Sequence, residues 1–179
     1  MSLDLQFTYR FEAGHRLTSS VAPSCATPHG HTWHVSVRFR GVPQADGRLL
    51  NDQQVLVEFG ELKKSWKMFV QECADHSYFH HENDVIIAAL KSEVAKPRLL
   101  ALPGDPTTEM IAAAFAVKLK TLHEASGLRR VQPISLSLRE TPVNAVQFRF
   151  SGTETWAWVA QALGTKKSWW NSKDPLARS

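Results

Sequence analysis

The segment FTYRFEAGH, residues 7–15, decides how the chain begins to fold. Its apolar side chains occupy every second position, and this period of two is typical of a β-strand with one apolar face. The apolar positions are Phe7, Tyr9, Phe11 and Ala13. We therefore expect a strand over residues 4–15. His15 shares the parity of the apolar positions, so its imidazole is predicted to lie on the same face of the strand.

A second alternating segment, HGHTWHVSVRF at residues 29–39, predicts a strand over 31–41. His31 has the parity of the apolar positions in this segment. His29 projects to the same side if the strand already includes Gly30, because side chains two residues apart share a face. Two neighbouring strands would then bring His15, His29 and His31 to one point.

Three neutral imidazoles can hold a zinc ion and leave one coordination position open, which is the arrangement of a catalytic site. Cys25, four residues before His29, is well placed to be a reactive group beside that metal. Two other interpretations stay open at this point. The histidines can be ordinary core or surface residues, or Cys25 can close a structural zinc site as the fourth ligand.

The rest of the chain predicts an antiparallel sheet covered by helices on one face, an α+β fold. The expected strands are 55–59, 131–140 and 143–151, with an extended segment at 99–102 and helices at 60–74, 84–94, 106–125 and 154–163. Asp105 is the expected N-cap of the third helix because Pro106 follows it. The polar stretch 75–83 is expected to be a loop that leaves His80 and His81 in solvent. Residues 1–151 are predicted to form one catalytic domain, and 152–179 a Trp-rich extension of the same domain that ends in a loose tail.

Composition bounds the class of protein. The chain has 179 residues, 43% of them hydrophobic, which suits one globular domain. No apolar run is long enough to cross a membrane, and no signal-peptide pattern is seen. Two distant cysteines make no disulfide framework, so a cytoplasmic location is expected. The net charge of +4 suits either nucleic acid or a small polyanionic substrate, and charge alone does not choose between them.

Four other residues are candidates for chemistry. Glu140 has the parity of the apolar positions in its strand, and its two oxygens suit a ligand with adjacent N–H donors. Pairing with an arginine, or exposure to solvent, is an equal alternative. Asp75 and His76 follow a helix end, where the carboxylate can fix the imidazole tautomer for proton transfer. Most such dipeptides are surface residues. Glu109 most simply favours its helix dipole.

The ordered motifs resemble those of the 6-pyruvoyltetrahydropterin synthase family, which includes the 6-carboxytetrahydropterin synthases of queuosine biosynthesis. The motifs are FEAGH, C-x3-HGH-x-W, VLVEFGELK, ADH, DPTTE and LRET, and they span roughly residues 5–150. The resemblance implies the tunnelling fold (T-fold) with a four-stranded antiparallel sheet, in which three subunits close a barrel and two trimers form a homohexamer.

The resemblance also implies the roles of the candidate residues. It implies Zn²⁺ on His15, His29 and His31, with Cys25 as the proton-abstracting base. An Asp75–His76 pair, from the same or a neighbouring subunit, would assist the base. Glu140 would anchor the pterin ring, and Glu109 would shape the pocket. The segment after His76 and the Trp-rich extension depart from the family pattern.

The implied activity is a zinc-dependent lyase that converts 7,8-dihydroneopterin triphosphate to 6-carboxy-5,6,7,8-tetrahydropterin, acetaldehyde and triphosphate. The short spacing from Cys25 to His29 resembles that of the carboxy-forming enzymes. The alternatives are the pyruvoyl-forming synthase or a related pterin side-chain aldolase, and a non-catalytic zinc-stabilised module that binds RNA or protein. The set of Cys25, Asp75, His76 and Glu140 argues against the last of these.

Overall fold

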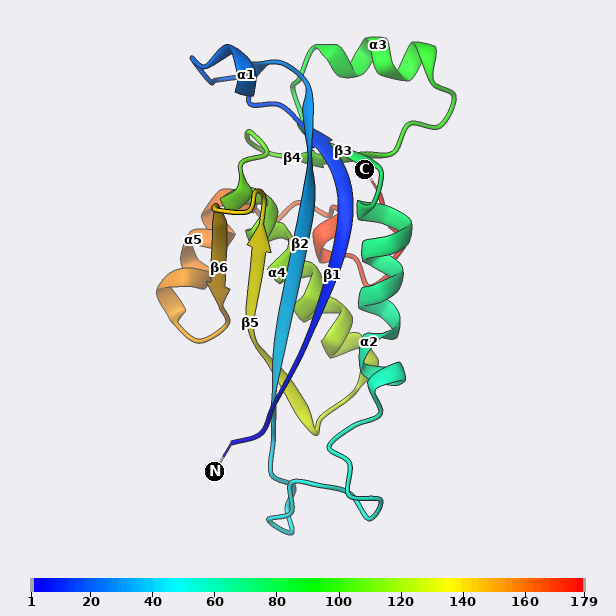
Figure 1. Ribbon diagram of the computed structural model, residues 1–179, viewed down its shortest axis with the longest axis vertical. Helices are drawn as coiled ribbons and strands as arrows, with labels where there is room; N and C mark the ends of the chain where they lie inside the picture. The colour runs from blue at the N-terminus through cyan, green and yellow to red at the C-terminus, as the bar shows by residue number, and fades with distance from the viewer. Residues whose placement is uncertain (1, 179) are drawn as a thin grey trace.

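A computed structural model describes residues 2–178 and contains a six-stranded sheet in the order β4-β3-β1-β2-β5-β6 (Figure 1). The strands are β1 (Asp4–His15), β2 (His29–Gly41), β3 (Ser77–His81), β4 (Leu99–Leu102), β5 (Val131–Arg139) and β6 (Ala145–Arg149). Neighbours from β1 through β2 and β5 to β6 are antiparallel. β3 pairs in parallel with β1 and with β4, and its contact with β1 covers only the last residues of that strand.

Five α-helices accompany the sheet in the described part of the chain. They are α1 (Pro23–Ala26), α2 (Phe59–Met68), α3 (Ile86–Glu93), α4 (Thr108–Ser126) and α5 (Thr153–Leu163). A π-helical segment, Phe69–Ala74, continues α2, and a 3-10 turn, Trp169–Asn171, follows α5. α1 and α3 lie at the same end of the molecule (Figure 1). Within residues 2–178, no helix combines the length and the hydrophobicity that a bilayer crossing requires.

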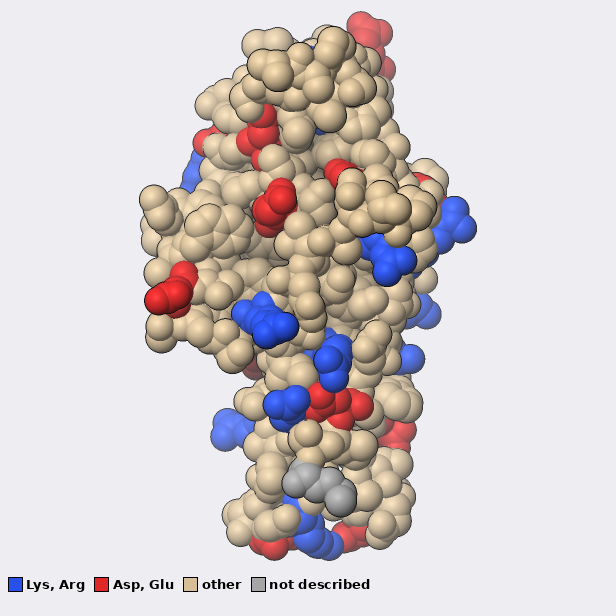
Figure 2. Space-filling model, turned by 60° about the vertical axis from the view of Figure 1, so that its left-hand side comes forward, with Lys and Arg blue, Asp and Glu red and all other residues tan. Residues whose placement is uncertain are grey.

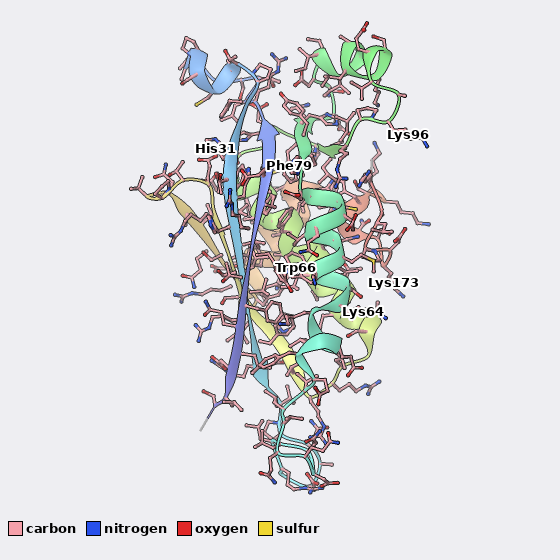
Figure 3. All side chains as sticks on the ribbon, turned by 45° about the vertical axis from the view of Figure 1, so that its right-hand side comes forward. His31, Lys64, Trp66, Phe79, Lys96 and Lys173 are labelled. Carbon is pink, nitrogen blue, oxygen red and sulfur yellow. The ribbon has the colours of Figure 1, made fainter. Side chains whose placement is uncertain are left out.

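The two helices α2 and α4 cover the apolar face of the sheet, as the alternation predicts. Phe11 of β1 stacks on Trp33 of β2 with 6.2 Å between ring centroids, and it also packs against Phe115 of α4. Trp66 of α2, labelled in Figure 3, meets Phe115 edge-on with 5.8 Å between ring centroids. The opposite face is polar: Arg40, for example, pairs with Asp4 across two strands. Period-two patterning therefore fixes which face of the sheet is buried.

Three sequence-based predictions about this architecture are wrong. The sheet has six strands and parallel pairings instead of four antiparallel strands. Residues 55–59 form no strand, because Leu56 inserts into the core and Glu58 is already the N-cap position of α2. The stretch 75–83 contains β3, where pairing on both sides leaves the His80 residue only 4% exposed.

The Trp-rich extension is packed against the domain and is not a loose tail. Trp169 is 1% exposed and Trp170 is 5% exposed, and both belong to the same hydrophobic cluster as the sheet and α4. Trp169 stacks on Phe69 of the π-helical segment with 5.7 Å between ring centroids. The prediction of a loose tail was wrong because the segment has no periodic apolar pattern. Single large side chains anchor it instead.

Candidate metal centre and active site

The register of β1 against β2 brings the three predicted histidines together. His15 pairs directly with His29, and Ala13 pairs with His31, so all three imidazoles project from the ends of adjacent strands on one face. Their ring centroids lie 4.5 to 5.2 Å apart. One ligand nitrogen from each ring lies within 4.8 Å of the other two. Figure 3 places His31 near the end of β2. This spacing suits three ligands of one ion.

Gly14 allows the sheet to close tightly beside the histidines. A Cβ at this position would lie 3.0 Å from the Tyr78 ring of β3 and 3.1 Å from the His29 carbonyl oxygen. Both contacts are shorter than ordinary van der Waals distances, and the second is to backbone, which cannot move aside easily. A larger residue here would push the Tyr78 ring or the β2 backbone aside by a few tenths of an ångström, so glycine lets β3 and β2 lie this close to the end of the strand that carries His15.

Backbone carbonyls set the tautomers of two of the histidines. His15 Nδ1 lies 2.8 Å from the Pro106 carbonyl oxygen, and His29 Nδ1 lies 2.8 Å from that of Thr27. A carbonyl oxygen only accepts hydrogen bonds, so each Nδ1 carries the proton and donates it. In the neutral imidazole, Nε2 then keeps its lone pair. Such an arrangement orients a histidine as a metal ligand and raises its basicity.

The charge and burial of the histidines fit a divalent metal. His15 is 2% exposed, and its Nε2 atom is buried without any hydrogen-bond partner in the described structure. Burial lowers the pKa of His15, although the bond to Pro106 opposes this, and burial also lowers the pKa of His31. Neutral rings with a free lone pair are the form that binds zinc. A metal ion would give the orphaned His15 nitrogen its missing partner.

A cavity of about 570 Å³ opens beside the three histidines. Cys25, Glu109 and Glu140 line it together with them. Cys25 is a half-buried free thiol in the one-turn helix α1, and its carbonyl accepts a hydrogen bond from the Leu17 amide at 2.8 Å. The loop that follows β1 is thereby folded back so that Cys25 faces the same cavity as the histidines. Five of the predicted site residues thus surround one space with Glu109 at its rim.

Glu140 lies closer to the histidines than its expected role as a ring anchor requires. Its Oε1 atom is 3.6 Å from His15 Nε2 and 3.9 Å from His31 Nε2. Across residues 2–178, its ion-pair contacts are with these imidazoles and not with Arg139 or Arg149, which were the alternative partners. The carboxylate is therefore positioned to hold a cation or an N–H donor at the inner end of the cavity.

Asp75 and His76 form a pair outside this cavity. Asp75 accepts a hydrogen bond from the Glu12 amide at 2.8 Å and one from His76 Nδ1 at 2.8 Å. Although burial raises the pKa of Asp75, these hydrogen bonds lower it below its ordinary value. The His76 side chain is 73% exposed, with a left-handed backbone φ of 56°. Within one chain, the pair faces solvent beside β1 and does not line the cavity of Cys25.

The groups that orient the histidines could not be predicted from the sequence. Pro106 and Thr27 act through carbonyl oxygens, which every residue has, so no residue type signals them. Asp105 is not the N-cap of α4, because Thr107 occupies that position and accepts the Met110 amide. Asp105 instead binds the loop after His15. The DPTTE motif drew attention to residues 105–109, but the sequence does not show which residues Asp105 contacts.

A single-sheet α+β fold with three convergent histidines, a nearby thiol and a carboxylate defines a candidate metal-dependent enzyme site. A family profile described as 6-pyruvoyl tetrahydropterin synthase matches residues 4–151 of this chain. This chain belongs to that family, and its fold is the tunnelling fold.

Named relatives and solved structures agree with this assignment. A 6-carboxy-5,6,7,8-tetrahydropterin synthase from Aquifex aeolicus is 26% identical over 167 residues, covering 83% of this chain and 99% of that protein. A probable 6-carboxy-5,6,7,8-tetrahydropterin synthase from Halobacterium salinarum is 26% identical over 74% of this chain and 77% of that protein. The Caenorhabditis elegans 6-pyruvoyl tetrahydropterin synthase structure superimposes with a TM-score of 0.54 at 18% identity, covering 84% and 97% of the two chains.

Proposed function

We propose that this chain is a zinc-dependent lyase acting on 7,8-dihydroneopterin triphosphate. The products are 6-carboxy-5,6,7,8-tetrahydropterin, acetaldehyde and triphosphate, and one water molecule is consumed so that atoms balance. Two relatives that carry the carboxy-forming name support this choice of product. The observation that carries the proposal is the cavity shared by Cys25, Glu140 and three histidines, two of which are oriented by backbone carbonyls that leave Nε2 free.

Each residue has a separate task in this reaction. Zinc, when bound, supplies a Lewis acid that acidifies the carbon beside the side-chain hydroxyls of the substrate. The Cys25 thiolate accepts the proton from that carbon. Glu140 receives the amino and ring N–H groups of the pterin through its two oxygens, which fixes the ring at the inner end of the cavity. Glu109, exposed at the rim, shapes the entrance.

Asp75 and His76 act in the cavity of a neighbouring copy, since they face solvent in their own chain. This requires an oligomer, and the homohexamer built from two trimers provides the subunit boundaries. The carboxylate holds the proton on His76 Nδ1, which leaves Nε2 free to exchange a proton with the thiol or the substrate. Mixed oligomers of Cys25→Ala and His76→Ala chains test this arrangement. Recovery of activity on mixing is expected, and two inactive variants that stay inactive together would place the pair elsewhere.

Product analysis by mass spectrometry tests the reaction. Zinc-loaded protein incubated with 7,8-dihydroneopterin triphosphate is expected to form 6-carboxytetrahydropterin, and Cys25→Ala is expected to lose this activity while still binding zinc. 6-Pyruvoyltetrahydropterin as the sole product would instead make the chain a pyruvoyl-forming synthase. No turnover with zinc bound would contradict the lyase. Figure 2 shows several Lys and Arg side chains close together across the middle of one face, with acidic side chains beside and above them.

A Glu140→Gln variant separates two uses of the carboxylate. As the ring anchor, Glu140 contributes to substrate binding, so the variant keeps its zinc affinity and raises KM. Its Oε1 atom also lies within 4 Å of two ligand nitrogens. Loss of zinc affinity in the variant would therefore make Glu140 a fourth metal ligand and remove it as the anchor of the pterin.

A further inference from the structure

Asp105 makes four hydrogen bonds to two consecutive residues in the loop after β1. One carboxylate oxygen accepts the amide of Thr18 at 2.8 Å and its hydroxyl at 2.6 Å. The other accepts the amide of Ser19 at 2.8 Å and its hydroxyl. Although burial raises the pKa of Asp105, these hydrogen bonds lower it to about 2. The carboxylate is therefore charged and saturated at neutral pH, and it has no capping role in α4 because Thr107 is the N-cap.

Both segments joined by Asp105 also carry parts of the candidate site. On one side, Pro106 directly follows Asp105 and accepts the hydrogen bond from His15 Nδ1. On the other side, Leu17 precedes Thr18 and donates its amide to the Cys25 carbonyl. The loop between β1 and β2 has only one short helix of its own, so its position depends on such contacts. Asp105 thus lies between the carbonyl that orients a metal ligand and the loop that presents the thiol.

We propose that Asp105 is a positioning residue, which ties the Pro106 carbonyl to the loop after β1 and so sets both the His15 tautomer and the place of Cys25. In the described residues its side-chain hydrogen bonds go to Thr18 and Ser19, not to the metal ligands or the thiol, and it acts through Pro106 and Leu17. The inference rests on the proposed function for its consequence in catalysis. The geometry also predicts changes in zinc affinity, in the tautomer of His15 and in the exposure of Cys25. These three properties can be measured without enzymatic turnover.

Zinc affinity and thiol exposure test the proposal in Asp105→Ala, with Asp46→Ala as the matched control. Asp46 also accepts a backbone amide and a side-chain donor, both from Arg48, in the loop at the opposite end of the molecule (Figure 1). We expect Asp105→Ala to weaken zinc binding about 10-fold in chelator competition, as loss of supporting contacts around metal ligands does. Alkylation of Cys25 by iodoacetamide, at saturating zinc, is expected to rise on the order of fivefold. The control is expected to stay within about twofold in both assays.

A spectroscopic signature separates positioning from a merely structural role. In nitrogen-15 spectra of the metal-free protein, His15 should show a single Nδ1–H tautomer, and Asp105→Ala should give a mixture of tautomers. Asp105→Asn keeps one carbonyl acceptor and is expected to restore part of each property. Wild-type zinc affinity, alkylation rate and His15 spectrum in a folded Asp105→Ala protein would overturn the proposal.

A second variant decides the question if Asp105→Ala fails to fold. Thr18→Val combined with Ser19→Ala removes both hydroxyl donors and keeps both backbone amide bonds to Asp105. The expected changes have the same direction and are smaller. Unchanged zinc affinity and alkylation in this folded variant would overturn the proposal. A protein that keeps these signatures but forms no pterin product would leave Asp105 as a positioning residue and reject the lyase.

Discussion

The candidate metal centre and the C-terminal extension both hold nitrogen groups against backbone carbonyls, and they do so with opposite results. At the candidate metal centre, His15 and His29 each give one N–H to a carbonyl and keep a lone pair open at Nε2. At the extension, the Lys118 ammonium of α4 gives hydrogen bonds to three carbonyls of the extension and keeps nothing open. An open lone pair marks a site that binds something else, whereas complete saturation marks a structural contact.

Lys118 is a buried cation whose partners all come from the extension. Its Nζ atom lies 2.9 Å from the carbonyl oxygens of Trp169 and Ser172 and 2.6 Å from that of Asp174. An ammonium has three donors, so the three carbonyls satisfy it completely. Burial lowers the pKa of Lys118 to about 8, and the group is still mostly protonated at pH 7. A lysine on the apolar face of α4 thus holds the last segment of the chain.

Replacement of Trp169 is expected to have the largest effect. It should lower the stability of the protein and leave zinc affinity unchanged. Trp169→Ala leaves a cavity beside Phe69 and removes the indole hydrogen bond to the Ala101 carbonyl. We expect a loss of about 4 kcal/mol in the free energy of unfolding, with zinc affinity within about twofold of wild type. Urea unfolding and chelator competition measure the two. Trp158→Ala, at an exposed position, is the control, and a large loss of zinc affinity in Trp169→Ala would erase the contrast between the regions.

Lys118→Met is expected to be next in size. The substitution leaves three buried carbonyl oxygens without their common donor, at a cost of about 3 kcal/mol in the free energy of unfolding. Lys120→Met, on the exposed side of the same helix, removes an equal charge and should cost less than about 1 kcal/mol. Thermal or urea unfolding of both variants compares them. Equal stability of the two variants would show that the carbonyls do not depend on the ammonium.

His29→Ala is expected to have the opposite effect to Trp169→Ala, because it should change zinc affinity and leave stability nearly unchanged. Loss of one of three imidazoles should weaken zinc binding about 100-fold, or about 2.7 kcal/mol, with little change in the unfolding of the metal-free protein. His34→Ala, on the same strand but outside the cavity of the metal centre, serves as the control. Zinc affinity by chelator competition checks both. Equal affinities in the two variants would remove His29 from the ligand set.

The smallest expected effect is a pH dependence of the free energy of unfolding of the metal-free protein. Burial lowers the pKa of His15 below the ordinary 6.5, so the unfolded chain takes up a proton before the folded chain does. The free energy of unfolding should therefore fall as the pH drops below 6.5, and His15→Gln should reduce this fall by on the order of 1 kcal/mol. Urea unfolding at pH 7.5 and 5.5 gives the comparison. An identical fall in both proteins would assign it to other histidines, such as the buried His80, whose pKa burial also lowers.

Much of the fold follows from alternation, and the errors lie where tertiary pairing overrides it. β1 and β2 agree closely with the predicted ranges because their faces differ consistently in polarity. The segment 55–59 is apolar and rich in valine, as strands often are, but it forms no strand in the sheet. β3 reads as a polar loop, yet it becomes a strand because β1 and β4 offer hydrogen bonds on both sides. Patterning predicts faces, and it does not predict partners.

The sequence by itself determined the parity of His15, His29 and His31, because side chains two residues apart must share a face of a strand. It also determined that Cys25 would lie close to them along the chain. Only the tertiary structure decided which nitrogen of His15 is free, since the Pro106 carbonyl that orients this ring lies 91 residues away in the sequence. The His15 tautomer, the buried ammonium contacts and the Asp105 links depend on segments that meet only after folding. Such contacts use backbone atoms that no residue type announces.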